Sequence, residues 1–410
     1  MFKSLSKNVL FRDTFWIAFA RGLTVLMGMV TSIVLTRCLS VSEIGTYELM
    51  FTYIAIGKVT TLPGMSHIIT KGVIKGYDLI YSRTVKLSFY FSVIGAVVFV
   101  FGGVYSLLAG RDNAMAPLMV IAGIIFPVFS LGQWDSVLAG KRKFRQSRIL
   151  CISTGLASLA IISITAIMSR NLVCVFTAAC LTQALTGVVG YIIARKQIGV
   201  CRVDRVLEGE LLKQGWKITF LSVFGFVVGR IDRLIIGTCD PAILAVYYIG
   251  SRIPEMIKSV TKELLMVPVT HFSTMNKKDN IKAIIKFGWV LLLGGVMITL
   301  VIWVLSPWLI VFLYGIQYKG AILVTRLLAL TIGGVLLKYV ISTMDLMQGK
   351  GKYYRQITII SQILYLPVVY ILFKKYSMIG VVISTLFTET VAFLGFLCYF
   401  IGSYRKTMKG

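Results

Sequence analysis

The sequence predicts an all-α integral membrane protein, and three observations support this fold class. Of its 410 residues, 57% are hydrophobic and only 14% are charged, which excludes a soluble domain of this length. Apolar runs of about 20–28 residues recur, long enough for an α-helix to cross a hydrocarbon core about 30 Å thick. Strand-like alternation bounded by turn residues is missing, so the runs predict transmembrane helices rather than a barrel.

Taken in order, the apolar runs give twelve predicted spans. They cover residues 13–36, 44–63, 85–109, 115–139, 148–169, 172–194, 215–238, 242–270, 284–312, 320–347, 357–373 and 377–402. An even number of spans places both ends of the chain on the same side of the membrane.

The distribution of basic residues predicts which side that is. Of the 43 Lys and Arg residues, 28 fall on the side that carries both termini, 6 fall on the opposite side and 9 fall within spans. By the positive-inside rule both termini are cytoplasmic. The net charge of +27 therefore follows from topology, and nucleic acid is not an expected partner.

Internal echoes divide the chain into two halves. Residues 135–144, DSVLAGKRKF, are echoed by residues 345–353, DLMQGKGKY, with the glycine and both lysines displaced by 209 positions; echoes elsewhere have shifts of 200–205. We therefore predict two pseudo-symmetric six-helix lobes, residues 1–200 and 201–410, as parallel repeats.

The echoed turns allow two interpretations. In one, glycine ends the helix and the basic residues anchor it against anionic lipid head groups. In the other, Asp135 pairs with Lys141 and Asp345 pairs with Lys350 to form a cytoplasmic gate that opens when the lobes move.

Charged residues interrupt the spans at 215–238 and 242–270. The first contains Arg230, Asp232 and Arg233, and the second contains Arg252, Glu255, Lys258, Lys262 and Glu263. Arg252, Glu255 and Lys258 follow i,i+3 spacing and share one helix face. One charge at the centre of a lipid-facing helix costs about 2.5–3.5 kcal/mol. The stripe must therefore face a solvated cavity or form a buried ladder of ion pairs.

Further charges within spans extend this pattern. They are Arg21, Glu48, Lys58, Arg326, Lys338 and Glu389. Cations at several depths predict a central cationic cavity for an anionic passenger, and Arg binds phosphate oxygens bidentately.

We assign roles to these charges as expectations. The expected diphosphate ligands are Arg252, Arg230, Arg233, Arg21, Lys58, Lys338 and Arg326. Asp232, Glu255 and Glu389 are expected either to bind a coupling H⁺ or Na⁺ or to neutralise neighbouring cations. Tyr247, Tyr248 and Gln133 are expected to line a path for sugar.

Catalytic and metal chemistry have no evident site in the sequence. The seven cysteines are scattered without a CxxC motif, and both histidines fall at helix ends. A membrane enzyme would need an external loop or an intramembrane His/Asp site, and neither is visible. We expect no enzyme activity, no cofactor and no metal.

Several motifs resemble the Wzx-type O-antigen or polysaccharide flippases of the multidrug/oligosaccharidyl-lipid/polysaccharide (MOP) exporter superfamily. They are LTRCLSVSEIGTYEL at the end of the first span, GRIDRLIIG followed by VYYIGSRI in spans seven and eight, and the turn LAGKRKF. Asp232 with Arg230 and Arg233 matches the first of the paired motifs, and Arg252 matches the second.

The resemblance implies a function and a location. It implies transfer of an undecaprenyl-diphosphate-linked oligosaccharide from the cytoplasmic to the periplasmic leaflet of a bacterial inner membrane by alternating access. Membrane lipids and a polysaccharide polymerase complex are further expected partners. The alternative is a multidrug or cation antiporter of the same superfamily, which would prefer an acidic, aromatic cavity.

Overall fold

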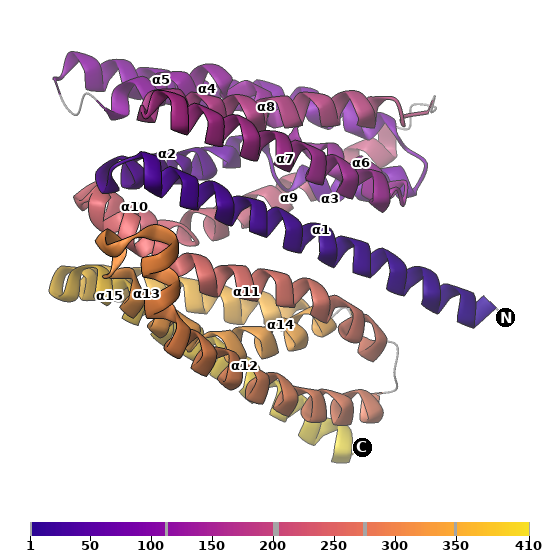
Figure 1. Cartoon of the computed structure of the whole chain (residues 1–410). Helices are drawn as coiled ribbons and strands as arrows, with labels where there is room; N and C mark the ends of the chain where they lie inside the picture. Colours follow the sequence, from indigo (N-terminus) through magenta and orange to yellow (C-terminus); the bar gives the residue numbers. More distant parts are fainter. Residues whose placement is uncertain (1, 111–113, 200–204, 274–276, 348–350, 410) are drawn as a thin grey trace. The chain divides into compact units, whose positions relative to one another are not determined.

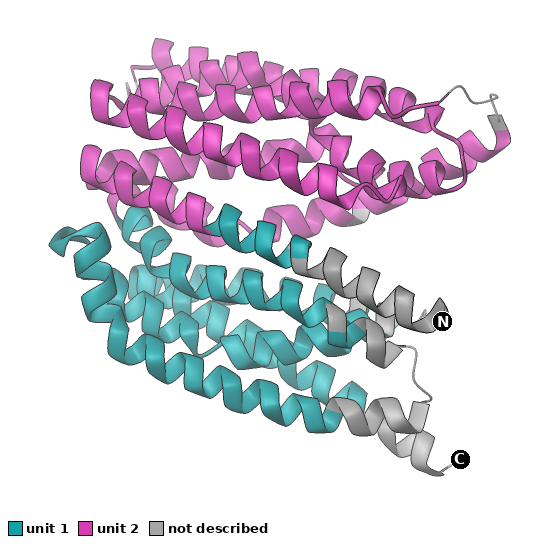
Figure 2. Ribbon diagram, turned by 45° about the vertical axis from the view of Figure 1, so that its right-hand side comes forward, with its two compact units in different colours: residues 1–25, 243–410 teal, residues 26–242 magenta. Residues whose placement is uncertain are grey.

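The regular structure of the chain is helical throughout the residues that the computed structural model describes, which are 2–110, 114–199, 205–273, 277–347 and 351–409 (Figure 1). Close packing of the backbone defines two compact units. Unit 1 contains residues 1–25 and 243–410, and unit 2 contains residues 26–242 (Figure 2). These units differ from the predicted lobes, which remain a prediction about internal repeats.

Unit 2 is built from the later turns of α1 and nine further α-helices, with two 3₁₀ segments. In chain order these are α1 (Phe2–Cys38), α2 (Val41–Gly57), η1 (Lys58–Thr61), α3 (Met65–Ile74), α4 (Leu79–Leu108), α5 (Met115–Ile125), η2 (Phe126–Gln133), α6 (Trp134–Gly140), α7 (Phe144–Ser169), α8 (Leu172–Arg195), α9 (Arg205–Val228) and α10 (Ile231–Cys239).

Helices α4, α5, α7 and α8 pack side by side in unit 2 (Figure 1). Their outer faces expose apolar side chains such as Phe101 and Met168, which is favourable only where lipid covers them. The core at one end is built around Trp134, Tyr81 and Leu138. Gly190 lets α8 approach closely, because a Cβ there would lie 2.3 Å from the Trp134 ring.

Two long apolar runs of unit 2 are broken inside the membrane segment. Pro127 falls at the start of η2, where the missing N–H and the ring of proline disfavour a regular α-helix. The predicted span 215–238 is not one helix either. It breaks at Arg230, whose φ of −132° and ψ of 3° are not helical, so Asp232 lies in the first turn of α10, where the helix dipole favours an acid.

Unit 1 contains the first turns of α1 and the remaining helices. These are α11 (Pro241–Ser273), α12 (Lys277–Tyr314), η3 (Ile316–Tyr318), α13 (Ala321–Ala329), α14 (Ile332–Met347) and α15 (Gly351–Lys409). Its core gathers Leu336, Val340, Ile341 and Phe396 from α14 and α15 with Val269 of α11. The residue Ser377, with φ of 51° and ψ of −134°, divides α15 into two arms, which confirms the predicted break between residues 373 and 377.

Prolines inside α11 and α12 free backbone carbonyls that α13 then bonds. Pro254 cannot donate to the Gly250 carbonyl, and the Thr325 hydroxyl donates to that oxygen instead over 2.8 Å. Pro307 cannot donate to the Trp303 carbonyl. The adjacent Arg326 donates to it from Nε over 3.1 Å and from a terminal nitrogen over 2.9 Å. Two neighbouring residues of one short helix thus repair two interrupted helices.

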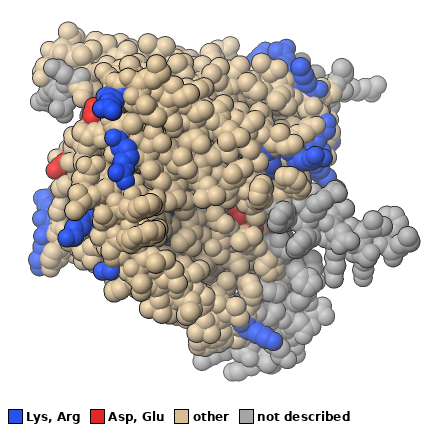
Figure 3. Space-filling model, viewed as in Figure 1, with Lys and Arg blue, Asp and Glu red and all other residues tan. Residues whose placement is uncertain are grey.

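The chain is a multi-pass membrane protein. Among the described residues, eight helical segments are long and apolar enough to cross a membrane, or nine if α13 and α14, bent by 43°, form one span. The segment 356–402 contains the two arms of α15. Starting from nine spans, the predicted total of twelve is reached if the two arms of α15 are counted separately and if α2 and the charged α11 are added. Figure 3 shows a face made mostly of uncharged side chains, with Lys and Arg near its edges.

Candidate functional site

Lys58 is a membrane-embedded cation of unit 2 that has only neutral partners. It lies at the start of η1, and its ammonium donates to Gln183 Oε1 of α8 over 3.0 Å. The ammonium also lies 4.6 Å from the centre of the Phe129 ring, within cation–π distance. No carboxylate lies within ion-pair distance of Lys58 in the described part of the chain. The Lys58 ammonium is therefore not engaged by an acid in the part of the chain that the structure describes.

Arg233 forms a buried ion pair and is less available than Lys58. Its guanidinium on α10 lies 2.6 Å from Glu48 Oε1 on α2, and both side chains are largely buried. Arg230, at the α9–α10 break, lies close enough to Lys58 to repel its ammonium. The motif GRIDRLIIG therefore places one arginine in a fixed pair and another beside an uncompensated lysine.

Arg21 carries available donors in unit 1. Its Nε donates to Ser259 Oγ of α11 over 3.0 Å, and its exposed terminal nitrogens have no partner among the described residues. Arg252, also on α11, lies over the Tyr248 ring at 4.6 Å and donates to the Tyr248 hydroxyl. Both arginines thus lie on or against α11, the helix that carries the predicted charged stripe.

Arg326 bonds the neighbouring helix α12 within unit 1. Besides its two bonds to the Trp303 carbonyl, its Nε lies 3.3 Å from Ser306 Oγ. The Trp303 indole returns a bond to the Arg326 carbonyl over 3.0 Å. The intramembrane charge of Arg326 is explained by the carbonyl that Pro307 frees.

Lys338 and Glu389 form an ion pair at a cavity inside unit 1. The sequence placed Lys338 among diphosphate ligands and Glu389 among coupling or ion-pair acids, and the structure brings the two together from α14 and α15. The cavity, about 220 Å³ in volume, lies among α11, α14 and α15 and is rich in hydroxyl and amide groups.

The sequence did not single out most of the cavity's polar residues as a site. Thr358, Ser361 and Gln362 follow i,i+3/i+4 spacing on the first arm of α15, and Thr388 precedes Glu389 on the second arm. Their spacing on an apolar helix is a signal that could have been found. Asp232 lies in the first turn of α10 and Glu255 is exposed on α11, so the three predicted acids do not share one site within either unit.

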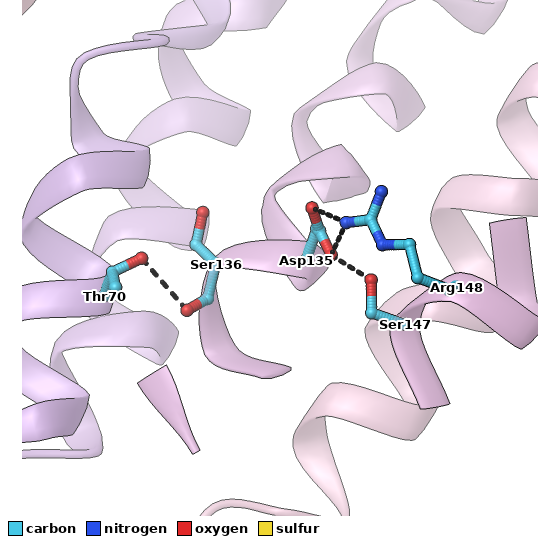
Figure 4. A network of polar contacts seen from close by, with 5 residues as sticks. All are labelled: Thr70, Asp135, Ser136, Ser147 and Arg148. Atoms are coloured by element: carbon cyan, nitrogen blue, oxygen red, sulfur yellow. Dashed lines mark hydrogen bonds and ion pairs between the residues drawn. The ribbon is translucent and has the colours of Figure 1, made fainter. Parts of the chain in front are cut away.

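The predicted pair between Asp135 and Lys141 is not formed. Asp135 instead accepts from Arg148, at 3.1 Å, and from Ser147 (Figure 4), while Lys141 lies 2.6 Å from Asp78. Six residues turn a helix by about 600° at 3.6 residues per turn, so the two side chains leave α6 on different faces. Asp345 and Lys350 lie outside the residues whose side chains are described.

Asp78 is a buried acid that the sequence analysis missed. It accepts from Lys141 and, over 2.9 Å, from the backbone N–H of Gly199. It thereby fastens the segment after α8 to the start of α4. The three residues expected to line a sugar path, Gln133, Tyr247 and Tyr248, are also buried, and Gln133 donates to the Thr61 carbonyl and to Ser88 Oγ within unit 2.

Comparison with known structures identifies the fold. A multidrug-resistance MATE transporter of the MOP superfamily in an inward-facing conformation is similar at 14% identity over 96% of each chain, with a TM-score of 0.65. A mutant of the Vibrio cholerae MATE transporter VcmN is similar at 14% identity over 98% of each chain, with a TM-score of 0.64. The lipid II flippase MurJ in an inward closed conformation is 16% identical over 95% of this chain and 87% of its own, with a TM-score of 0.62.

Sequence comparison identifies the family. No curated protein matches the chain. A family model described as polysaccharide biosynthesis protein matches residues 10–270, more than half of the chain. The chain therefore belongs to the polysaccharide biosynthesis protein family, and its fold is that of the MOP-superfamily transporters.

Proposed function

We propose that the protein is a flippase. It moves an undecaprenyl-diphosphate-linked oligosaccharide, an O-antigen or related repeat unit, from the cytoplasmic to the periplasmic leaflet of a bacterial inner membrane by alternating access. Both termini are cytoplasmic in this proposal. The family match and the likeness of the fold to a lipid II flippase support transport of a lipid-linked sugar.

The observation that carries the proposal is the surplus of cations within the membrane helices. Arg21, Lys58, Lys258 and Lys262 have no carboxylate within 4.0 Å among the described residues. A charge within the membrane that lacks an ionic partner is expensive, so these cations favour an anionic passenger over a cationic one. A diphosphate offers several oxygens that Lys and Arg side chains bind through charge-assisted hydrogen bonds.

We divide the predicted ligands into two groups. Arg252, Arg230, Arg21, Lys58 and Lys338 remain the proposed diphosphate ligands. We assign Arg233 and Arg326 structural roles, because Glu48 and the Trp303 carbonyl hold them.

Coupling to an ion is part of the proposal. Asp232, Glu255 or Glu389 would bind H⁺ or Na⁺, and Glu255, exposed on α11, is the acid to test first. If Glu255→Gln abolishes the pH or Na⁺ dependence of transport, Glu255 carries the coupling; an unchanged dependence removes it.

The experiment that tests the function is genetic complementation. The gene is deleted in its host and restored as wild type, Arg252→Ala, Arg252→Lys or Arg21→Gln, with the exposed Lys319→Met as the matched control. Surface polysaccharide and cytoplasmic lipid-linked intermediate are measured beside the membrane level of each variant.

The expected result is loss of surface polysaccharide and accumulation of intermediate in the deletion strain. Arg252→Ala and Arg21→Gln should resemble the deletion at normal protein level, while Lys319→Met should resemble wild type. Survival of surface polysaccharide after deletion, with raised sensitivity to dyes or drugs, would overturn the proposal. That outcome would favour the second candidate function, an antiporter, whose support is the likeness of the fold to MATE transporters.

A further inference from the structure

The cavity inside unit 1 has the charge and the donors of an anion site. Its walls come from three helices of the same unit. The side chains that line the cavity include Lys262, Lys338, Tyr339, Gln362, Thr388 and Glu389. At about 220 Å³ it is smaller than the roughly 300–1,000 Å³ of pockets for drug-sized ligands, and it suits an ion or one small group.

Positive charge exceeds negative charge along the cavity wall. Lys338 is paired with Glu389, and Glu389 is the acid that lines the cavity. Lys262 also lines it and has no carboxylate within ion-pair distance in the described part of the chain; its ammonium lies 5.9 Å from the centre of the Tyr339 ring. Lys262 is repelled by Lys338 and attracted by Glu389 at longer range. One positive charge on the wall is therefore uncompensated.

Charged groups next to the cavity do not remove that excess. Lys258 lies close enough to Lys262, Lys338 and Glu389 to interact with them electrostatically, and Glu255 lies close enough to Lys258 to offset its charge. Glu263 interacts electrostatically with Tyr339 and does not line the cavity.

Unused hydrogen-bonding groups accompany the excess charge. The Thr388 hydroxyl is buried and has no partner among the described residues. The Gln362 amide likewise has no bonded partner there. A buried hydroxyl left without a bond costs about 1–3 kcal/mol. An ammonium is a donor only, and a hydroxyl and an amide N–H can donate beside it, so the three groups can converge on an anion.

We propose that this cavity binds a small singly charged anion, either chloride or the carboxylate of an acidic sugar, with Lys262 as its principal ligand. The anion would compensate the charge of Lys262 and accept from Thr388 and Gln362. Two ammonium groups on the wall oppose a sodium ion at the same place, so a coupling role of Glu389 would be limited to H⁺. The site lies within one unit of the chain. Binding of chloride there would not depend on the flippase assignment, whereas binding of a sugar carboxylate rests on that proposed function.

The test measures the melting temperature of the purified full-length protein in uncharged lipid nanodiscs. Isethionate, a larger anion, is replaced by chloride or by acetate at constant ionic strength, and each series is repeated with sodium and with choline. A ligand that binds the folded protein raises the melting temperature in a saturable way. The variants are Lys262→Met, Glu389→Gln and Thr388→Val, with the exposed Lys319→Met as control.

We expect chloride, acetate or both to raise the melting temperature of wild type and of Lys319→Met, whichever cation is present. Lys262→Met should weaken the apparent affinity at least tenfold, and Glu389→Gln, which removes the competing carboxylate, should strengthen it at least fivefold. Thr388→Val keeps the charge and should weaken binding several-fold, so it tests the site even if Lys262→Met does not fold. A stronger response to chloride identifies an inorganic ion, and a stronger response to acetate identifies a substrate carboxylate.

Three outcomes would overturn the proposal. A response that follows sodium rather than the anion would indicate a cation site. A wild-type chloride response in Lys262→Met would place the anion elsewhere. A cooperative wild-type transition that neither anion shifts would leave the cavity without an anion.

Discussion

Two regions of unit 1 contain a cation within the membrane, and they use it differently. At the α12–α13 contact, Arg326 directs two nitrogens at the Trp303 carbonyl and one of them also at Ser306. At the cavity among α11, α14 and α15, Lys262 has only a distant aromatic ring and a shared, remote carboxylate. The first cation completes the fold, and the second remains available.

The difference teaches that charge inside a span does not by itself indicate a ligand. A guanidinium has five N–H donors, and two nitrogens of Arg326 bond a carbonyl that an interrupted helix leaves free. Whether a cation fills such a need of the backbone distinguishes a structural cation from an available one. Removing a structural cation should destabilise the protein, while removing an available cation should affect binding.

Arg233→Met should give the largest loss of stability. It would leave the Glu48 carboxylate buried without its partner at 2.6 Å, which costs about 3–5 kcal/mol. Thermal unfolding in detergent measures the loss. The double variant Arg233→Met with Glu48→Leu should recover most of it, and a double variant as unstable as the single would contradict the ion-pair explanation.

Arg326→Met should cost less, about 1–3 kcal/mol, because it leaves the freed Trp303 carbonyl with only a weak 3.4 Å contact from Ser306. Adding Pro307→Ala restores an N–H that can reach this carbonyl and should rescue stability. Urea or thermal unfolding of the single and double variants tests this. Unchanged stability with lost transport would instead return Arg326 to the diphosphate ligands.

Thr325→Val should have a smaller effect of the same kind, about 1 kcal/mol, because one neutral hydrogen bond of 2.8 Å to the Gly250 carbonyl is lost. Pro254→Ala should rescue it. The measurement is the melting temperature of the four combinations, and additive effects without rescue would show that the proline and the threonine act independently.

Lys262→Met should change stability least, by less than about 1 kcal/mol in chloride-free buffer, since no ion pair is broken. A modest gain is consistent with removal of an uncompensated charge. Unfolding curves of the variant beside wild type check this. A loss as large as that of Arg233→Met would mean that Lys262 is structural and would erase the contrast between the two regions.

Most of the fold could be predicted because hydrophobic length is a local property of the sequence. The all-helical membrane class is confirmed, and the interval between the predicted spans 357–373 and 377–402 correctly marked the break near Ser377. The break at Arg230 was not predicted, since a run of apolar residues with three charges can continue as one helix unless packing interrupts it. Length and composition support eight or nine spans among the described residues. The other spans of the predicted twelve remain a prediction.

The candidate site was harder to predict because its contacts join distant residues. Lys338 and Glu389 were named separately from their positions in spans, and only the fold shows that they meet. Arg326 seemed equivalent to Arg252 in sequence, although a proline 19 residues earlier determines its bonding. The acid that holds Lys141 is Asp78, 63 residues away, so a search among near neighbours chose Asp135 instead.

The repair of α11 and α12 by adjacent residues of α13 has a consequence for how such sequences diverge. A proline at position 254 is tolerated while a hydroxyl stands at 325, and a proline at 307 is tolerated while a long donor stands at 326. In a relative that loses one of these prolines, the donor at the partner position is no longer needed. In a relative that loses the donor first, the carbonyl lacks its hydrogen bond until the proline is also replaced. Substitutions at the two pairs should therefore be correlated in descent, with the proline changing first.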